Sequence, residues 1–200
     1  MKRRIKSTPL DLLGLFFLIF GTISISNAIV STEPAQIFFL CYIALIIIGI
    51  AILTRNSYAI MSQLYIIAVP QILWTIDLIY QLSMNQPLLG LSDYLFTPRF
   101  PLLGIIISAQ HIFTIPAALY AVKKIGLKRK DAWKISYIQI TIIYILVSFL
   151  AITNTNINCI SRPCIDINLG LPHWLTWFLA IFLMTYFTSI VLNRLVGKRD

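Results

Sequence analysis

The sequence predicts an all-α integral membrane protein, a polytopic helical bundle with six transmembrane helices and both termini in the cytoplasm. Apolar residues make up 58% of the 200 residues, charged residues make up only 12%, and the mean hydropathy is +0.85. A soluble domain carries about 25% charged residues. The composition therefore excludes a soluble globular protein, a disordered chain and a small disulfide-stapled domain. The length fits a single domain over residues 1–200.

Six apolar segments are long enough to cross a membrane as helices. A spanning helix needs roughly 20 mostly apolar residues, because the hydrocarbon core is about 30 Å thick and a helix rises about 1.5 Å per residue. The long apolar runs also lack the alternation that is typical of a membrane barrel strand. We expect the spans at about residues 10–30, 35–54, 59–82, 101–122, 136–153 and 171–192.

The positions of the basic residues predict the orientation. With the N-terminus in the cytoplasm, 14 of the 16 Lys and Arg residues fall on the cytoplasmic side, and only Arg99 and Arg162 fall outside. Cytoplasmic loops carry such an excess of Lys and Arg. This bias accounts for the net charge of +9, so we expect membrane lipids as partners and no nucleic acid. The sequence thus predicts a multi-pass protein of a prokaryotic plasma membrane.

The first segment has a second interpretation. The basic start MKRRIK, the apolar stretch and the run Ser26–Asn27–Ala28 have the order of a cleavable signal peptide. The apolar run is longer than the roughly 7–15 residues of a signal peptide, which favours a retained first helix. Cleavage would leave five spans.

Two predicted loops have unusual compositions. The cytoplasmic loop of residues 123–134, KKIGLKRKDAWK, holds six cations. It is either a docking patch for anionic lipid, at about 1 kcal/mol per basic residue near the surface, or a topology determinant without a further role. The external loop of residues 84–100 is rich in apolar side chains. It is either a short helix in the membrane interface, with Asp93 and Arg99 in water, or a linker that follows the membrane surface.

The second external loop carries Cys159 and Cys164, a candidate disulfide. An oxidising exterior permits a disulfide at this spacing, and it would pin the loop. A zinc site would need more ligands than His173 supplies. We therefore expect no metal, and no motif in the sequence calls for another cofactor.

Asp77 and His111 are the ionisable side chains, other than Tyr and Cys, that lie well inside the predicted spans. An acid inside a span is costly, so it usually faces the bundle interior and has a partner. At about 1.5 Å per residue, the two lie roughly 7 Å and 15 Å from the outer ends of their helices. Helix tilt or a bridging Gln110 can close that gap. Internal prolines, Pro70 and Pro116, are expected to kink both helices.

The Asp77–His111 pair has two interpretations. In the first, both residues are catalytic: Asp77 orients His111 and favours its imidazolium, and His111 moves a proton near neutral pH. Trp74, Gln110 and Asn158 are then the candidate substrate-binding residues. In the second, the pair is an interhelical hydrogen bond that fixes packing.

Several spaced runs resemble a family of uncharacterised six-helix prokaryotic membrane proteins, which implies no particular activity. The resemblance covers roughly residues 70–175 and is carried by WTIDLIYQL, LLGLSDYLF, RFPLLGIIISAQHIFTIPAAL, KKIGLKRKDAW and NIN.

A more distant likeness is to the transmembrane acyltransferase and androgen-induced-gene hydrolase group. It rests on a polar motif late in the third span, a His within the fourth, an Asn-rich loop and a Pro-x-Trp opening the sixth. Those proteins pair an intramembrane His with a Cys or Thr nucleophile acting on lipid esters, and His111 matches that His. The third span departs from the pattern, because it has no Cys and offers Trp74, Thr75 and Asp77.

Three classes of function remain open from the sequence. The position of His111 favours an enzyme that acts on lipid esters. The ionisable pair and the two prolines favour a small-molecule transporter or a proton-coupled binding protein. A membrane scaffold without catalysis is the third class. The sequence contains no nucleotide loop, haem-ligand pair or Gly-Ser nucleophile motif, so those enzyme classes are set aside.

Overall fold

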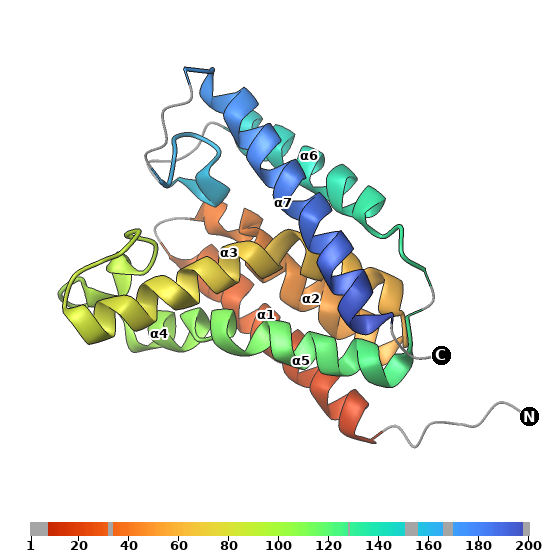
Figure 1. Ribbon diagram of the computed structural model, residues 1–200. Helices are drawn as coiled ribbons and strands as arrows, with labels where there is room; N and C mark the ends of the chain where they lie inside the picture. Colours follow the sequence, from red (N-terminus) through yellow and green to blue (C-terminus); the bar gives the residue numbers. More distant parts are fainter. Residues whose placement is uncertain (1–7, 32–33, 128, 151–155, 166–169, 198–200) are drawn as a thin grey trace, which may run out of the picture.

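The chain forms a bundle of α-helices, shown in Figure 1 as a computed structural model. The structure describes residues 8–31, 34–127, 129–150, 156–165 and 170–197. The predicted all-α fold class is confirmed over these residues. The α-helices are α1 (Thr8–Val30), α2 (Leu40–Leu53), α3 (Ser57–Met84), α4 (Leu102–Ser108), α5 (Gln110–Ile125), α6 (Trp133–Leu150) and α7 (His173–Val196).

These seven helices occupy the six predicted segments, because one segment is broken. Helices α4 and α5 together cover Leu102–Ile125 and are interrupted at Ala109. In the part of the chain that the structure describes, four stretches are long and apolar enough to cross a membrane. They are Pro9–Val30, Ser57–Met84, Leu102–Ile125 and His173–Val196.

Helices α2 and α6 are shorter. Helix α2 has 14 residues, about 21 Å at 1.5 Å per residue, against a hydrocarbon core of about 30 Å. The expected second span of residues 35–54 divides at Phe39 into the 3-10 helix η1 (Pro34–Phe38) and α2. Helix α6 has 18 residues. The expected end of its span at residue 153, like the basic start at residues 2–6, lies outside the described residues.

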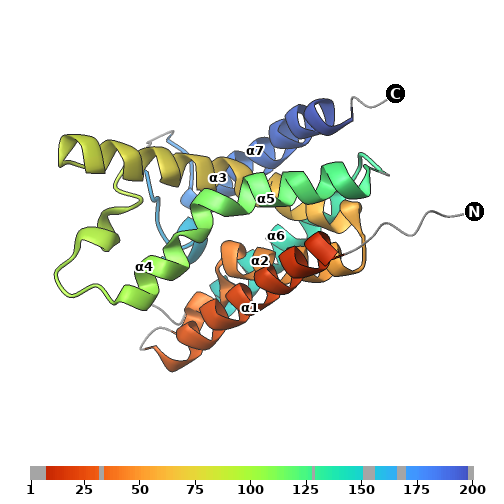
Figure 2. The same ribbon diagram turned by 90° about the horizontal axis from the view of Figure 1, so that it is seen from below.

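Helix α3 lies at the centre of the bundle, where it contacts α2, α5, α6 and α7 (Figures 1 and 2). Residues Ile60–Ala68 are all buried. The helix begins at an N-cap, where the side-chain oxygen of Asn56 accepts from the Ala59 amide at 3.2 Å. It ends at Asn85, whose left-handed φ of 53° is tolerated by asparagine better than by most residues. Polar side chains on the buried faces of α3 therefore face other protein groups, either a neighbouring helix or the loop that follows α3.

Helices α1 and α2 approach each other so closely that glycine is required. A Cβ atom on Gly49 would lie 2.9 Å from the backbone oxygen of Gly14, and one on Gly14 would lie 2.8 Å from the Leu53 side chain. Small residues permit this kind of approach between helices in membranes. The α1–α2 pair thus forms one firmly packed wall of the bundle.

One end of the bundle gathers basic residues, and we call it the basic end. Asp11 and Arg55 form an ion pair there at 2.6 Å, which joins α1 to the turn after α2. The Asn193 amide donates to the backbone oxygen of Lys130 at 3.0 Å, so the end of α7 lies beside the start of α6. The described basic residues at this end are Arg55, Lys123, Lys124, Arg129, Lys130, Lys134 and Arg194.

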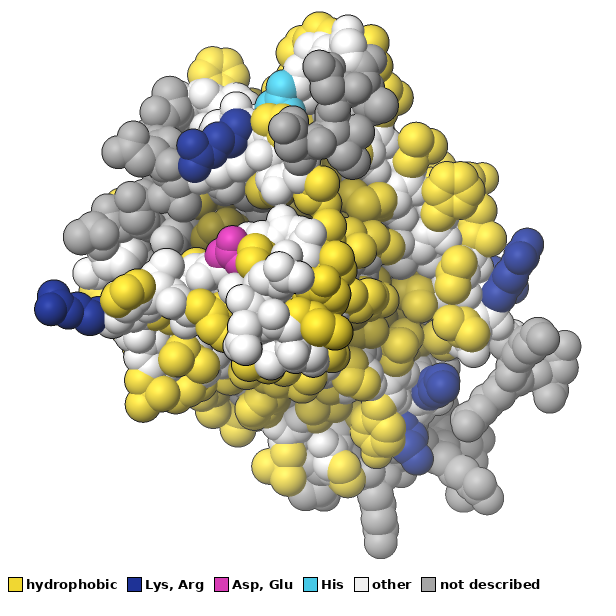
Figure 3. Space-filling model, turned by 60° about the vertical axis from the view of Figure 1, so that its left-hand side comes forward, with side chains coloured by type: hydrophobic (Ala, Val, Ile, Leu, Met, Phe, Trp, Pro, Cys, Tyr) yellow, Lys and Arg dark blue, Asp and Glu magenta, His cyan; other side chains and the backbone are white. Residues whose placement is uncertain are grey.

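The outside of the bundle is strongly apolar. Phe149 is 85% exposed, and Leu12 and Phe187 are 63% and 60% exposed. In the space-filling view, hydrophobic side chains cover most of the visible face and the Lys and Arg side chains lie toward its edges (Figure 3). Soluble monomers rarely expose such continuous apolar surface, so this surface is compatible with contact to lipid.

Candidate functional site

The Asp77 side chain is fully buried and is held by the loop that follows α3. Its Oδ1 accepts from the backbone amides of Leu88, Leu89 and Gly90 at 3.1, 2.6 and 3.2 Å. Its Oδ2 accepts from the backbone amide of Ser92 at 2.8 Å and from the Ser92 hydroxyl at 2.7 Å. Five donors therefore converge on one carboxylate, which explains how an acid is accommodated inside an apolar helix.

The expected Asp77–His111 pair is not formed. The hydrogen bonds of Asp77 within the described chain all run to residues 88–92, and His111 has other partners. The physical reason is that backbone amides compete well for a buried carboxylate when a loop can fold back over it. The loop does so with Gly90 at a φ of 74°, in the left-handed region that glycine adopts readily. Asp77 is therefore an anchor for the loop.

His111 is held by the break between α4 and α5. The backbone amide of Ile112 donates to the backbone oxygen of Ala109 at 3.0 Å. In a regular α-helix it would donate to the backbone oxygen of Ser108. The freed Ser108 oxygen lies 2.8 Å from Nδ1 of His111. Because a carbonyl oxygen only accepts, Nδ1 carries the proton, and Nε2 of the neutral ring is an acceptor.

The imidazole of His111 also stacks on the indole of Trp74. The two ring centroids are 4.4 Å apart and the planes are inclined by 26°. The Thr75 hydroxyl lies 3.3 Å from the backbone oxygen of His111, which gives a second contact between α3 and α5. Trp74 and His111, two of the residues predicted for the site, are thus brought together.

Buried polar atoms without a hydrogen-bond partner in the described chain belong to residues close in sequence to this stack. They include both amide atoms of Gln71, both amide atoms of Gln110 and the hydroxyl of Thr114. All three side chains are at most 1% exposed. Each lies within about one helical turn of Trp74 or His111 along α3 or α5. We call Gln71, Trp74, Gln110, His111 and Thr114 the polar cluster.

A different glutamine pair shows how the same bundle satisfies a buried amide. Gln63 in α3 donates to Gln139 in α6 at 2.8 Å, and Gln139 donates back at 3.1 Å. Gln63 is 1% exposed, as is Gln71 two turns further along the helix. The polar cluster therefore differs from ordinary interhelical packing, because its amides face the interior and make no such pair.

Tyr94 connects the loop above the cluster to α4. Its hydroxyl donates to the Ser108 side chain at 3.0 Å. Burial raises the pKa of Tyr94, so the hydroxyl stays protonated and able to donate this bond at neutral pH. The short 3-10 helix η2 (Asp93–Phe96) that carries it lies in the loop for which the sequence allows a short helix.

Asn158 lies away from the polar cluster and ties the second loop to α2. Its side chain donates to the Phe38 oxygen at 2.8 Å and accepts from the Leu40 amide at 3.0 Å. Its own backbone oxygen accepts from the Trp177 indole at 2.8 Å. Both ends of the amide are therefore used by the fold, and we leave Asn158 out of the site.

Cys159 and Cys164 are joined in a disulfide, with Cα atoms 5.3 Å apart. Nε2 of His173, at the start of α7, lies 3.0 Å from the backbone oxygen of Cys159. Together with Asn158, these contacts fix the second loop against the ends of α2 and α7. The loop thus has a structural role in this fold.

Sequence reasoning missed Gln71 and Thr114. Pro70, which the sequence singles out as an internal proline, is exposed, whereas its neighbour Gln71 is buried. The available signal was spacing, because Gln71 precedes Trp74 by three residues and Thr114 follows Gln110 by four, so each pair shares a helix face.

No family model, no curated protein and no solved structure matches this chain. The assignment of function therefore rests on the geometry of the polar cluster and of the loop anchored above it.

We predict that Asp77→Asn lowers the free energy of unfolding by about 2 kcal/mol, because hydrogen bonds to a charged group are lost and the new amide nitrogen faces a donor. Reversible unfolding in mixed detergent micelles measures the change, and faster hydrogen exchange at Leu89 and Ser92 would locate it. Asp93→Asn, an exposed acid in the same loop, is the matched control. Equal stability of the two variants would contradict the anchoring role.

Proposed function

We propose that the chain is an integral protein of a prokaryotic plasma membrane that crosses it six times, with both termini in the cytoplasm. Four stretches long and apolar enough to span, and an outer surface rich in exposed apolar side chains, support membrane insertion. The remaining two crossings are α2, extended by η1, and α6. The gathering of Lys and Arg at the basic end supports its cytoplasmic placement.

Cysteine labelling tests this topology. We replace Gln86, in the loop after α3, or Lys124, at the basic end, by cysteine in a Cys41→Ala background that keeps the Cys159–Cys164 disulfide. A membrane-impermeant maleimide added to intact cells is expected to label position 86 and to spare position 124 until the cells are permeabilised. Labelling of position 124 in intact cells would reverse the orientation.

We infer further that the polar cluster is a binding site for an uncharged polar group. The observation that carries this inference is that the buried amides of Gln71 and Gln110 have no partner in the described chain. A buried donor or acceptor left unsatisfied costs about 1–3 kcal/mol. A ligand that both donates and accepts hydrogen bonds would offset this cost at both amides.

The chemistry of the polar cluster favours a neutral ligand. It contains no Lys or Arg, and the nearby carboxylate of Asp77 is taken up by the loop. Trp74 lies ten residues before the end of α3, about 15 Å at 1.5 Å per residue. This depth corresponds to the outer half of a core about 30 Å thick. A hydroxyl or an amide, which both donates and accepts hydrogen bonds, is a group of the right kind at this depth.

We predict that replacing two glutamines of α3 by leucine has different effects on the stability of the protein. Gln71→Leu removes partnerless polar atoms at similar volume, so the melting temperature of the ligand-free protein in detergent should rise or stay the same. Gln63→Leu leaves the Gln139 amide unpaired and should lower the free energy of unfolding by about 2 kcal/mol. An equal loss in both variants would show that Gln71 serves packing and would remove the case for a ligand.

Hydrolysis of a lipid ester is a second candidate function, favoured by the tautomer of His111. With the proton of Nδ1 held at the Ser108 oxygen, the lone pair of Nε2 can take a proton from a water that attacks an ester carbonyl. The imidazolium then gives this proton to the leaving alkoxide as the ester C–O bond breaks, which releases a carboxylic acid and an alcohol. Asp77 has no role in this hydrolysis mechanism, because its carboxylate is hydrogen-bonded to the loop of residues 88–92. The likeness of His111 to the catalytic His of the acyltransferase and hydrolase group also supports it.

The two histidines of the chain provide a matched test of this second function. We predict that the purified protein cleaves a long-chain ester of 4-methylumbelliferone, that His111→Gln lowers the rate by roughly 10²–10⁴-fold, and that His173→Gln leaves it unchanged. Lack of cleavage by the unaltered protein, or full activity of His111→Gln, would exclude hydrolysis and leave binding alone.

A further inference from the structure

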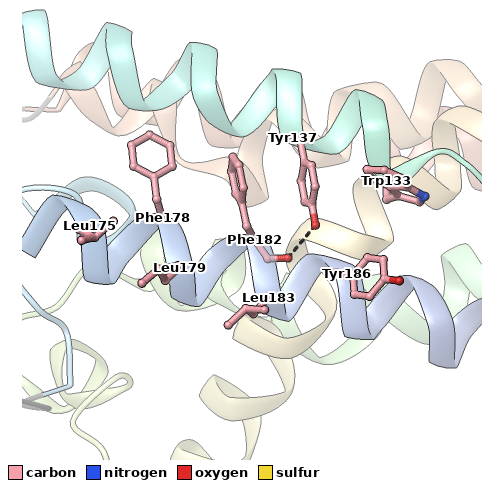
Figure 4. A pocket seen from close by; sticks show the side chains of 8 residues that line it. All are labelled: Trp133, Tyr137, Leu175, Phe178, Leu179, Phe182, Leu183 and Tyr186. Atoms are coloured by element: carbon pink, nitrogen blue, oxygen red, sulfur yellow. Dashed lines mark hydrogen bonds between the residues drawn. The ribbon is translucent and has the colours of Figure 1, made fainter. Parts of the chain in front are cut away.

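A groove of about 440 Å³ lies between α6 and α7 on the outside of the bundle, away from the polar cluster (Figure 4). Such a volume is within the range of small-molecule sites, about 300–1,000 Å³. Aromatic and leucine side chains line it. They include Trp133 and Tyr137 of α6 with Phe178, Leu179, Phe182 and Tyr186 of α7.

The walls of the groove are held in place by contacts of their own. The rings of Tyr137 and Phe182 stack with centroids 4.4 Å apart and planes 8° apart. The Tyr137 hydroxyl, which would otherwise put a polar atom into the groove, donates to the backbone oxygen of Phe182 at 3.0 Å (Figure 4). The groove is therefore preformed, and its interior suits an apolar occupant.

The groove ends next to the basic loop of residues 123–134. Trp133, near the end of that segment, is the first residue of α6, and its ring lies 6.2 Å from the ring of Tyr186. Tryptophan and tyrosine are enriched where a membrane helix meets the headgroups. The ammonium of Lys134 lies 5.7 Å from the Trp133 ring centroid and 3.8 Å from Oδ2 of Asp131, and the Lys134 side chain is 61% exposed. A cation thus stands at the mouth of an apolar groove.

The groove is about as long as one leaflet of a membrane is thick, and it runs from Trp133 toward Leu175, two residues from the start of α7. Along α7 it extends from Leu175 to Tyr186, a rise of about 16 Å at 1.5 Å per residue. The hydrocarbon core of a bilayer is about 30 Å thick, so one leaflet contributes about half of that. An acyl chain whose headgroup lies at the Trp133 end would run along the groove.

We propose that the groove binds an acyl chain of an anionic phospholipid whose phosphate lies beside Lys134 in the leaflet at the basic end. The loop of residues 123–134 contains six cations and a single acid, Asp131, so it complements a negative headgroup. A second copy of the chain fits less well, because pairing through this groove would bring two basic loops together. The proposal is independent of any ligand of the polar cluster.

Native mass spectrometry of the full chain in detergent tests the proposal, with dioleoyl phosphatidylglycerol and dioleoyl phosphatidylcholine as probes. The two lipids share their acyl chains and differ in headgroup charge. We expect tighter binding of phosphatidylglycerol, weakened by added salt. Lys134→Gln should lower that affinity roughly fivefold, whereas Lys124→Gln, the same charge change at the end of α5, should have a smaller effect.

A second pair of variants tests the groove itself. Leu179→Trp fills it and should reduce bound phosphatidylglycerol to the level of phosphatidylcholine. Leu195→Trp, on α7 outside the groove, should not. Lys134 is a surface residue, so Lys134→Gln is expected to fold and still tests anionic lipid binding even where Leu179→Trp does not fold. Equal binding of both lipids by the unaltered protein, or a dimer that Leu179→Trp dissociates, would overturn the proposal.

Discussion

The buried carboxylate of Asp77 is the constraint on which the half of this bundle opposite the basic end depends. A negative charge inside an apolar helix requires several donors close by, and the chain supplies them from the loop at residues 88–92. The loop must therefore fold back over α3. In doing so it carries Tyr94 to α4, where the tyrosine hydroxyl meets Ser108. One electrostatic requirement thus determines both the path of the loop and its attachment to the helix that leads to His111.

The region under this loop is built differently from the rest of the interior. Near the basic end, the side-chain amides of Gln63 and Gln139 hydrogen-bond to each other. Helices α1 and α2 pack closely through Gly14 and Gly49. Around Trp74 and His111, two buried amides have no such partner in the described chain. The helix break at Ala109 adds to the contrast, because it frees a backbone oxygen that then fixes the proton of His111 on one ring nitrogen. A few polar groups without a protein partner in an otherwise apolar interior are typical of binding sites.

Hydropathy predicts where the apolar helices lie, because it depends on composition alone, and four stretches of the described chain are long and apolar enough to cross a membrane. It fails where a single distant contact sets a boundary. The second segment divides at Phe39, where the side chain of Asn158, 118 residues beyond Leu40, bonds the backbone on both sides. The partner of Asp77 was equally hard to foresee, because its donors are mainly backbone amides, which every sequence has. The burial of Gln71 could have been found from its spacing to Trp74.

Cryo-electron microscopy of the protein, extracted from its own membranes into lipid nanodiscs, would show whether the polar cluster holds a ligand. We expect non-protein density between α3 and α5, within about 2.7–3.2 Å of the side-chain amides of both Gln71 and Gln110, beneath a loop anchored on Asp77. A map in which these two amides bond to each other, or to ordered water alone, would contradict the proposed binding site.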